Sequence, residues 1–319
     1  MEHKRPPLKQ ALLVIVLVLS SLCSYGQLAE LRQVQSARTM AKHHAKDTAW
    51  SLACEAYRKF AGNPKYANPY DHLDYSYLSL KRGDTATFAQ YLEQAIRGGV
   101  DTVTIRRFYR RLGQAEQSRL DRFIADRFEP LHRAGLANYD TTTIRELQSI
   151  HELDQLLRTQ IDKIVSVNPS GWKTDSGLHY LTRVAKFADS VNYTRVIRLF
   201  RSGRFPGYQR CGAAAISLGQ ALMHFDGPYV DWDYVFGMMK GAVLSGDMDP
   251  DQVAGIVDRH YLGRPGTSGY YYGRLKWGEE YPFYDCKQVD RFRAEIGLES
   301  LKSEYERGKR ALPACYEGG

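Results

Sequence analysis

The chain has 319 residues, of which 43% are hydrophobic and 25% are charged, and its formal net charge is +8 at pH 7. These proportions are those of an ordinary globular protein and exclude a disordered or low-complexity chain. Because a single hydrophobic core stops growing beyond about 250 residues, the length predicts two domains.

The first 26 residues have the layout of a secretory signal peptide. The basic residues Lys4, Arg5 and Lys9 precede an apolar run over 11–19, and small residues follow as far as Gly26. The apolar run is shorter than the about 20 residues that span a bilayer, and no later stretch approaches that length. We therefore expect cleavage near Gly26, an exported protein that is periplasmic or secreted, and no transmembrane segment after cleavage.

The net charge indicates which partners the mature chain could bind, and Cys23 indicates how it could be anchored. Removal of the signal peptide lowers the net charge from +8 to +6, so the mature protein stays basic. In an exported chain this favours an anionic polymer or lipid head groups over nucleic acid, although a solvated basic surface is the simpler interpretation. Cys23 raises a lipoprotein alternative, which is less expected because Leu22 stands where lipid-attachment signals have a small residue.

Four cysteines remain after the signal peptide, and export permits them to form disulfides. Four cysteines allow three pairings, and we favour Cys286 with Cys315 because that bond would close the C-terminal segment. Their spacings fit no zinc-binding pattern. The four are Cys54, Cys211, Cys286 and Cys315.

The region 27–133 is predicted to be helical with repeat-like packing. Residues 47–61 are expected to form one helix, and residues 72–98 a helical hairpin whose arms meet at Gly83 and Asp84. In the second arm apolar residues recur at spacings of three and four, and a pair of glycines ends it. The hairpin resembles a tetratricopeptide-type helix pair, but one visible repeat falls short of the about three that a stable array needs.

The next predicted helix carries a basic side. Its arginines would either hold an anionic partner or simply face water, partly neutralised by nearby carboxylates. They are Arg106, Arg107, Arg110 and Arg111.

A polar stretch over 134–143 is predicted to link this region to a second helical domain over 144–319. Thr143 and Glu146 have the spacing of a capping box at the start of a long helix. Further helices are predicted over about 190–202 and 213–225, after Asp231, from Asp249 onward, and over 288–307.

A segment over 263–285 that is rich in glycine and aromatic residues is predicted to be a loop or a short hairpin. Its tyrosines at 270–272 would suit stacking on sugar rings, but they more simply cover one end of the domain. No region alternates strands with helices. The expected fold is therefore all-α, with helical hairpins followed by a second multi-helix domain.

Asp154 lies within the apolar stripe of the long helix, where a carboxylate must be paired or must face a cleft. His151 and Arg158 stand three and four residues away, so both can reach it. The arrangement predicts either a buried ion pair between helices or an acidic group held by a guanidinium at a pocket wall.

Two other polar features are predicted to point inward. The nearly apolar helix over 213–225 carries one polar stripe that ends at His224, which is either a satisfied core histidine or part of a pocket. Asp258 and Arg259 follow Pro250 on a later helix, and Asp258 lies beside apolar positions, as a structural ion pair or a pocket residue would.

The sequence lacks the motifs of several chemistries. It has no GxSxG motif, no phosphate-binding glycine loop, no dinucleotide fingerprint and no metal-ligand spacing such as HExxH. We therefore predict no metal and no cofactor.

Short motifs follow one another through the second half of the chain. They are Asp154, Gln155 and Arg158 as DQxxR, Asp189 and Asn192 as DxxN, His224 and Asp226 as HxD, Asp258 and Arg259 as DR, and the closing RAEIGLESL. In this order, from Ile144 to Lys309, they resemble an uncharacterised bacterial family known only as a domain of unknown function.

The chain departs from that family at Met223, where a glutamine is usual, and over 272–275. The resemblance implies no established activity, but it marks the same polar positions as the helical pattern. The predicted pocket residues are Asp154, Gln155, Arg158, Asn192, His224, Asp226, Asp258 and Arg259.

Two functions fit these features. The favoured one is an exported binding or scaffold protein, in which the repeat-like half contacts another envelope protein or an anionic polymer and the second half supplies a polar pocket. The alternative is a hydrolase or lyase acting on an envelope or extracellular polymer. In that case His224 with Asp154 or Asp258 would serve as general acid and base. Arg158 or Arg259 would hold an anionic group.

Overall fold

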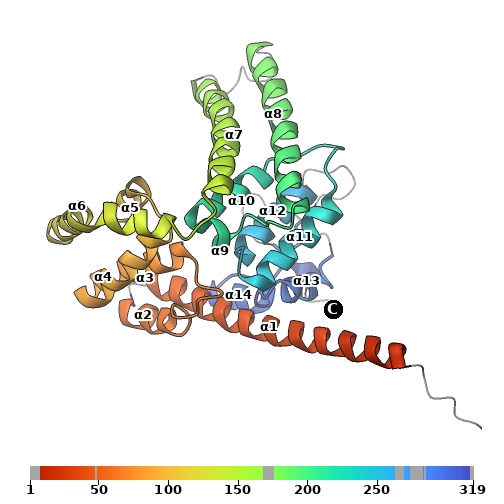
Figure 1. Ribbon diagram of the computed structural model, residues 1–319, viewed down its shortest axis with the longest axis horizontal. Coiled ribbons are helices and arrows are strands. Elements are labelled where there is room, and N and C mark those ends of the chain that lie inside the picture. Colours follow the sequence, from red (N-terminus) through yellow and green to blue (C-terminus); the bar gives the residue numbers. More distant parts are fainter. Residues whose placement is uncertain are drawn as a thin grey trace, which may run out of the picture.

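The computed structural model describes residues 8–46, 49–167, 176–262, 269–273, 283 and 285–316. Within these ranges it has no β-strand, and its one β feature is an isolated bridge between Tyr270 and Phe283. The predicted all-α fold is confirmed (Figure 1). The helices are α1 (Leu8–Lys46), α2 (Trp50–Arg58), α3 (Pro69–Lys81), α4 (Thr85–Arg97), α5 (Thr102–Phe108), α6 (Gln114–Leu136), α7 (Thr141–Val167), α8 (Ser176–Arg201), α9 (Tyr208–Cys211), η2 (Gly212–Ala215), α10 (Ile216–Leu222), α11 (Trp232–Ser245), α12 (Pro250–Leu262), α13 (Val289–Glu295), α14 (Leu301–Arg307) and η3 (Ala314–Tyr316).

The long first helix, α1, has an extended part and a packed part. Its N-terminal part, red in Figure 1, reaches beyond the body of the molecule, and its later part lies along the base. The packed part contacts α2 and α11 and buries Leu31, Val34 and Ala41. Among the helices that the structure describes, none is long and apolar enough to cross a membrane.

The hairpin predicted over 72–98 is confirmed as α3 and α4. The first helix begins earlier than predicted, at Pro69, because the Asn68 side chain caps it in a capping box. In the turn Gly83 has a φ of +83°, a left-handed conformation that favours glycine, and the Asp84 side chain caps α4. The local signals for this hairpin were therefore sufficient.

Successive helices of the N-terminal half pack on one another. The helix α1 contacts α2, α2 contacts α3, α3 contacts α4, and α4 contacts α6, which is the repeat-like packing expected for this half. A small core forms between α3, α4 and α6. Its buried members include Leu73, Leu80, Phe88, Leu92, Ile96, Leu120 and Ile124.

The four arginines predicted to share one side of a helix are exposed to solvent, as the simpler interpretation expected, but they do not lie on one helix. The helix α5 ends at Phe108, so Arg110 and Arg111 lie in the following turn. At this turn Tyr109 is fully buried, and its hydroxyl contacts that of Ser76 on α3. The arginine spacing predicted a helix that continues through this turn.

A second, larger core crosses the predicted boundary between the halves. It combines buried residues of α1, α2 and α3 with residues of α7, α8, α10, α11, α12 and α13. Where a linker was predicted over 134–143, α6 runs to Leu136 and α7 begins at Thr141. Asp140 caps α7 by accepting from the N–H of Thr143 at 3.0 Å, so Thr143 lies inside the helix and is not its cap.

Three other helices differ from their predicted ranges. The helix α8 begins at Ser176, well before the predicted 190, and the segment over 213–225 starts as a 3₁₀ turn before α10. The helix predicted over 288–307 is two helices, because Gly297 has a φ of +76° and turns the chain. A Cβ at Gly297 would lie 2.7 Å from the side chain of Leu31, so the turn packs closely on α1. The loop predicted over 263–285 lies mostly outside the described residues.

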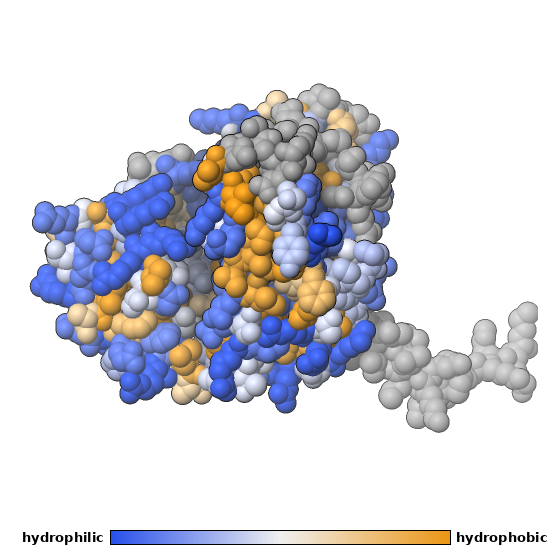
Figure 2. All heavy atoms as spheres, turned by 90° about the horizontal axis from the view of Figure 1, so that it is seen from above, coloured by the Kyte–Doolittle hydropathy of each residue, from blue (hydrophilic) through white to orange (hydrophobic). Residues whose placement is uncertain are grey.

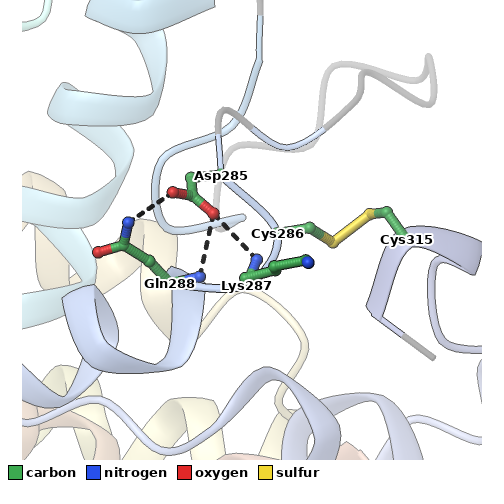
Figure 3. Close-up of a disulfide and its surroundings, with 5 residues drawn as sticks. All are labelled: Asp285, Cys286, Lys287, Gln288 and Cys315. Atoms are coloured by element: carbon green, nitrogen blue, oxygen red, sulfur yellow. Dashed lines mark hydrogen bonds between the residues drawn. A yellow bond between two sulfur atoms is a disulfide. The ribbon is translucent and has the colours of Figure 1, made fainter. Parts of the chain in front are cut away.

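A disulfide joins Cys286 to Cys315 and ties the C-terminal segment to the start of α13, which is the pairing favoured from the sequence (Figure 3). The carboxylate of Asp285 accepts hydrogen bonds from the two residues after Cys286, so the turn that carries the disulfide is itself capped. Cys54 and Cys211 are buried free thiols.

Arg38, on α1, is the centre of a buried ion-pair network. It is only 3% exposed. Its Nε donates to Oδ1 of Asp71 at 2.7 Å and its Nη2 to Oδ2 at 2.5 Å, while Nη1 lies 3.4 Å from Oδ2 of Asp249. Nη2 also donates to the backbone carbonyl of Tyr66 at 3.1 Å. One guanidinium therefore joins α1, α3 and the residue that precedes α12.

Asp74 lies on α3, one turn after Asp71, and accepts a hydrogen bond from the Tyr57 hydroxyl at 2.6 Å. Burial raises its pKa from 3.8 to about 6, although Tyr57, Lys42 and Arg38 act in the opposite direction. The folded protein thus holds this proton more tightly than the unfolded chain does. Its stability should therefore decline as the pH rises from about 4 to about 6.

Replacement of Asp74 by asparagine is expected to raise the free energy of unfolding at pH 7 by about 1 to 3 kcal/mol. The amide carries no charge to desolvate, so most of the decline between pH 4 and pH 6 should disappear. Urea unfolding at a series of pH values measures both effects. Asp121→Asn, which changes a half-exposed carboxylate, is the control, and an unchanged pH profile in Asp74→Asn would contradict the raised pKa.

Candidate functional site

Several of the charged residues that the sequence marked gather where three helices meet. In Figure 1, α7 and α8 rise side by side from the body, with α10 near their base. Asp154 lies on α7, Asp189 lies on α8, and His224 follows the C-terminal end of α10. We call Asp154, Arg158, Asp189 and His224 the charge cluster.

Asp154 is 3% exposed and is fully engaged. Its Oδ1 accepts from Nε of Arg158 at 2.9 Å and contacts Nδ1 of His224 at 2.8 Å, while its Oδ2 accepts from Nε2 of Gln155 at 2.6 Å. An ionised carboxylate only accepts, so Nδ1 of His224 carries the hydrogen. Burial acts to raise the pKa of Asp154, but the hydrogen bonds from His224 and Arg158 prevail and lower it.

Asp189 is the second carboxylate of the cluster. Nη2 of Arg158 donates to its Oδ1 at 2.6 Å, so one guanidinium bridges Asp154 and Asp189. Burial raises the pKa of Asp189 even though Arg158 lowers it. Two carboxyl groups on one arginine therefore have pKa values displaced in opposite directions, a pattern that occurs where acid and base roles are divided.

The groups of the cluster are arranged in two layers. The carboxylates are innermost, with side chains 2% exposed for Asp154 and 9% for Asp189. The nitrogen-bearing side chains lie outside them, with His224 at 19% and Arg158 at 24%. The surface that a ligand would meet is thus formed by hydrogen-bond donors held in place by buried acceptors.

His151 does not take the role that its spacing suggested. Its Nδ1 is buried without a hydrogen-bond partner among the described residues, and His224, 70 residues further along the chain, occupies the position beside Asp154. Spacing along one helix shows which residues share a face, but it does not show which side chain a second helix will bring to that face.

Asn192 ties α8 to α7. It is 1% exposed, and its Nδ2 donates to the backbone carbonyl of Ile150 at 3.1 Å. Its Oδ1 has no partner among the described residues. The residue therefore braces the two helices that carry Asp154 and Asp189.

The adjacent residues Asp258 and Arg259 interact with different parts of the protein. Asp258 is fully buried, and its Oδ1 accepts from the backbone N–H groups of Tyr272 at 2.6 Å and Gly273 at 3.2 Å. It therefore holds the 270–273 segment against α12. Burial lowers the pKa of Arg259 and so does the positive charge of Arg158, which places Arg259 within electrostatic reach of the cluster.

The predicted pocket set left out two residues of this region, Asp189 within the cluster and Tyr229 beside it. Asp189 was visible only through its motif with Asn192. No motif or spacing in the sequence indicated Tyr229. Its pKa is raised by burial and by the charges of Asp189 and Asp226. Asp226 itself is exposed and stands at the rim.

Within the residues that the structure describes, no group of three or more His, Cys, Asp or Glu side chains is placed to hold a metal ion. The side chains that do converge are charge-paired with one another.

Comparison with known proteins adds no relative to this description. No family model, no curated protein and no solved structure matches the chain.

Proposed function

We propose that the protein is an exported helical binding module whose charge cluster receives an anionic group of its ligand. The observation that carries the proposal is the layering of the cluster, with Arg158 and His224 outermost over buried carboxylates. Arg259 adds a second guanidinium within electrostatic reach. Planar guanidinium groups suit carboxylate and phosphate groups, so an anionic polymer or an acidic side chain of a partner is the expected ligand class.

The stacked helices of the N-terminal half support a scaffold role beside that pocket. Arrays of helix pairs present extended surfaces to other proteins, and α2, α3, α4 and α6 pack in sequence in this manner. Export rests on the signal-like first 26 residues, and membership of the domain-of-unknown-function family rests on the motifs from Ile144 to Lys309. These three statements stay predictions.

Titration with inorganic phosphate and with acetate tests the anion site. Saturable binding is expected for the wild-type protein, with a dissociation constant on the order of 1 mM for so small a probe. His224→Gln and Arg259→Gln should each weaken it about tenfold, because the first replaces the imidazole of the outer layer and the second removes a guanidinium charge. Isothermal titration calorimetry at constant ionic strength measures the effect.

Arg106→Gln provides the matched control, since Arg106 is an exposed arginine of α5 that is paired with Asp121 of α6 and is not part of the cluster. It should bind both anions as the wild-type protein does. Equal binding in all four proteins, or no saturable binding in the wild type, would exclude the anion site.

The alternative of a hydrolase or lyase is supported by the pair of Asp154 and His224. The carboxylate holds the imidazole through Nδ1, which leaves Nε2 as the nitrogen that exchanges a proton with a substrate. Asp258 is not part of this pair, because it accepts backbone hydrogen bonds at another place. Release of new ends from a purified cell-wall polysaccharide, lowered about 10²-fold or more in His224→Gln, would favour this function over binding alone.

A further inference from the structure

The outer face of α8 is apolar where a solvent-facing helix is normally polar. Tyr180, Val184, Phe187 and Val191 follow one another at spacings of four, three and four, so they form one stripe along the helix. The exposed fractions are 60% for Tyr180, 69% for Phe187 and 37% for Val191. The opposite face, which includes Leu178 and the other buried residues of α8, packs toward α7. The stripe is therefore not part of the core.

The position of α8 makes this stripe accessible. The α7–α8 pair projects from the body in Figure 1. Figure 2 looks down on that end of the molecule and shows a band of apolar residues there, bordered by hydrophilic ones. From Tyr180 to Val191 the stripe runs about 16 Å along the helix.

Positive charge flanks the stripe. Arg183 and Lys186 are exposed on α8 and lie within about 100° of Phe187 around the helix axis. The single acidic residue of α8 is Asp189, which is buried and bound by Arg158. The outer face of this helix is thus apolar and basic, without a negative side chain of its own.

We propose that this face of α8 docks on an anionic phospholipid surface. Its aromatic and aliphatic side chains would enter the boundary between head groups and acyl chains, and Arg183 and Lys186 would lie against lipid phosphates. Charge complementarity selects this occupant over a second copy of the chain. A two-fold contact through α8 would bring Arg183 and Lys186 of both copies together, and those like charges would repel one another.

The proposal is independent of the anion site, because the stripe faces outward and the charge cluster lies between α7, α8 and α10. The proposal predicts where the protein is found in the cell envelope. An exported protein held by α8 would remain at a membrane surface after its signal peptide is removed.

Vesicle co-sedimentation of the full chain tests the proposal. The apolar run over 11–19 would bind bilayers by itself, so every protein in the experiment carries Leu13→Asp and Leu17→Asp. Binding is expected to vesicles that contain phosphatidylglycerol and not to vesicles of phosphatidylcholine alone. The pair Tyr180→Ser and Phe187→Ser should lower the partition coefficient about tenfold or more, since it removes the largest apolar side chains of the stripe.

The charges are tested separately. Arg183→Gln with Lys186→Gln should also lower binding about tenfold or more and should remove most of its dependence on salt. The control pair Val103→Ser and Phe108→Ser changes exposed apolar residues of α5 and should bind as the parent does. Because all these side chains are exposed, circular dichroism should be unchanged.

Three results would overturn the proposal. The first is equal binding by the parent and both α8 variants, and the second is binding without a preference for phosphatidylglycerol. The third is a dimer in sedimentation equilibrium that Tyr180→Ser with Phe187→Ser dissociates, which would make the stripe an interface between two copies. Loss of vesicle binding with retention of phosphate binding would confirm that this surface and the anion site are separate.

Discussion

Replacement of Arg38 by alanine is expected to lower the free energy of unfolding by about 3 to 5 kcal/mol. The substitution leaves the carboxylates of Asp71 and Asp249 without the guanidinium that neutralises them, and Asp71 is only 3% exposed. It also removes the link between α1, α3 and the start of α12. Urea unfolding followed by circular dichroism measures the loss.

Arg106→Ala is the matched control for this experiment. Arg106 also pairs with an aspartate, Asp121, at 2.6 Å, but both side chains are about half exposed, and exposed pairs contribute about 0 to 1 kcal/mol. The difference between the two variants therefore measures how much burial of the ion pair, and not pairing alone, contributes to the free energy of unfolding. A cost for Arg38→Ala no larger than that for Arg106→Ala would show that α1 is held by its apolar contacts alone.

The second large effect is expected at Asp258. Replacement by alanine should cost about 2 to 4 kcal/mol, because the N–H groups of Tyr272 and Gly273 lose a charged acceptor in a fully buried position. The carbonyl of Tyr272 in turn accepts from Nη1 of Arg293 at 2.5 Å, so the loss extends toward the C-terminal helices. Hydrogen exchange at the amides of Tyr272 and Gly273 should become faster.

Two further variants separate the roles of the predicted pocket residues. Asp258→Asn keeps one acceptor oxygen and should cost less than Asp258→Ala. Asp226→Asn changes an exposed carboxylate of the same predicted set and should alter stability by less than about 0.5 kcal/mol. If Asp258→Ala were as neutral as Asp226→Asn, Asp258 would not brace the fold. A role for Asp258 in the predicted pocket would then have to be considered again.

Much of the fold could be predicted because its signals are local. The α3–α4 hairpin followed from apolar spacing and from turn residues such as Gly83 and Asp84. The inward position of Asp154 followed from the same periodicity, since a polar residue within an apolar stripe faces the core. The pairing of Cys286 with Cys315 was favoured because it closes the end of the chain.

Other features could not be predicted because they depend on contacts between distant segments. Tyr109, in the turn after α5, is buried beside α3, and the turn at Gly297 packs closely on α1. In both cases the sequence pattern predicted a helix that continues past the point where the helix ends in the structure. The Arg38 network had no local signal at all, since its three members lie on segments far apart in the sequence.

By itself the sequence determined an all-α chain, the positions of most helices, and the presence of charged groups on their inner faces. Those properties follow from the 3.6-residue period and from capping, which act over a few residues. The tertiary structure alone decided which charges meet: His224 beside Asp154, Asp189 across Arg158, and Asp258 against the backbone of 272–273. Such partners are chosen by how whole helices dock, and docking depends on packing across the entire core, which no local pattern encodes.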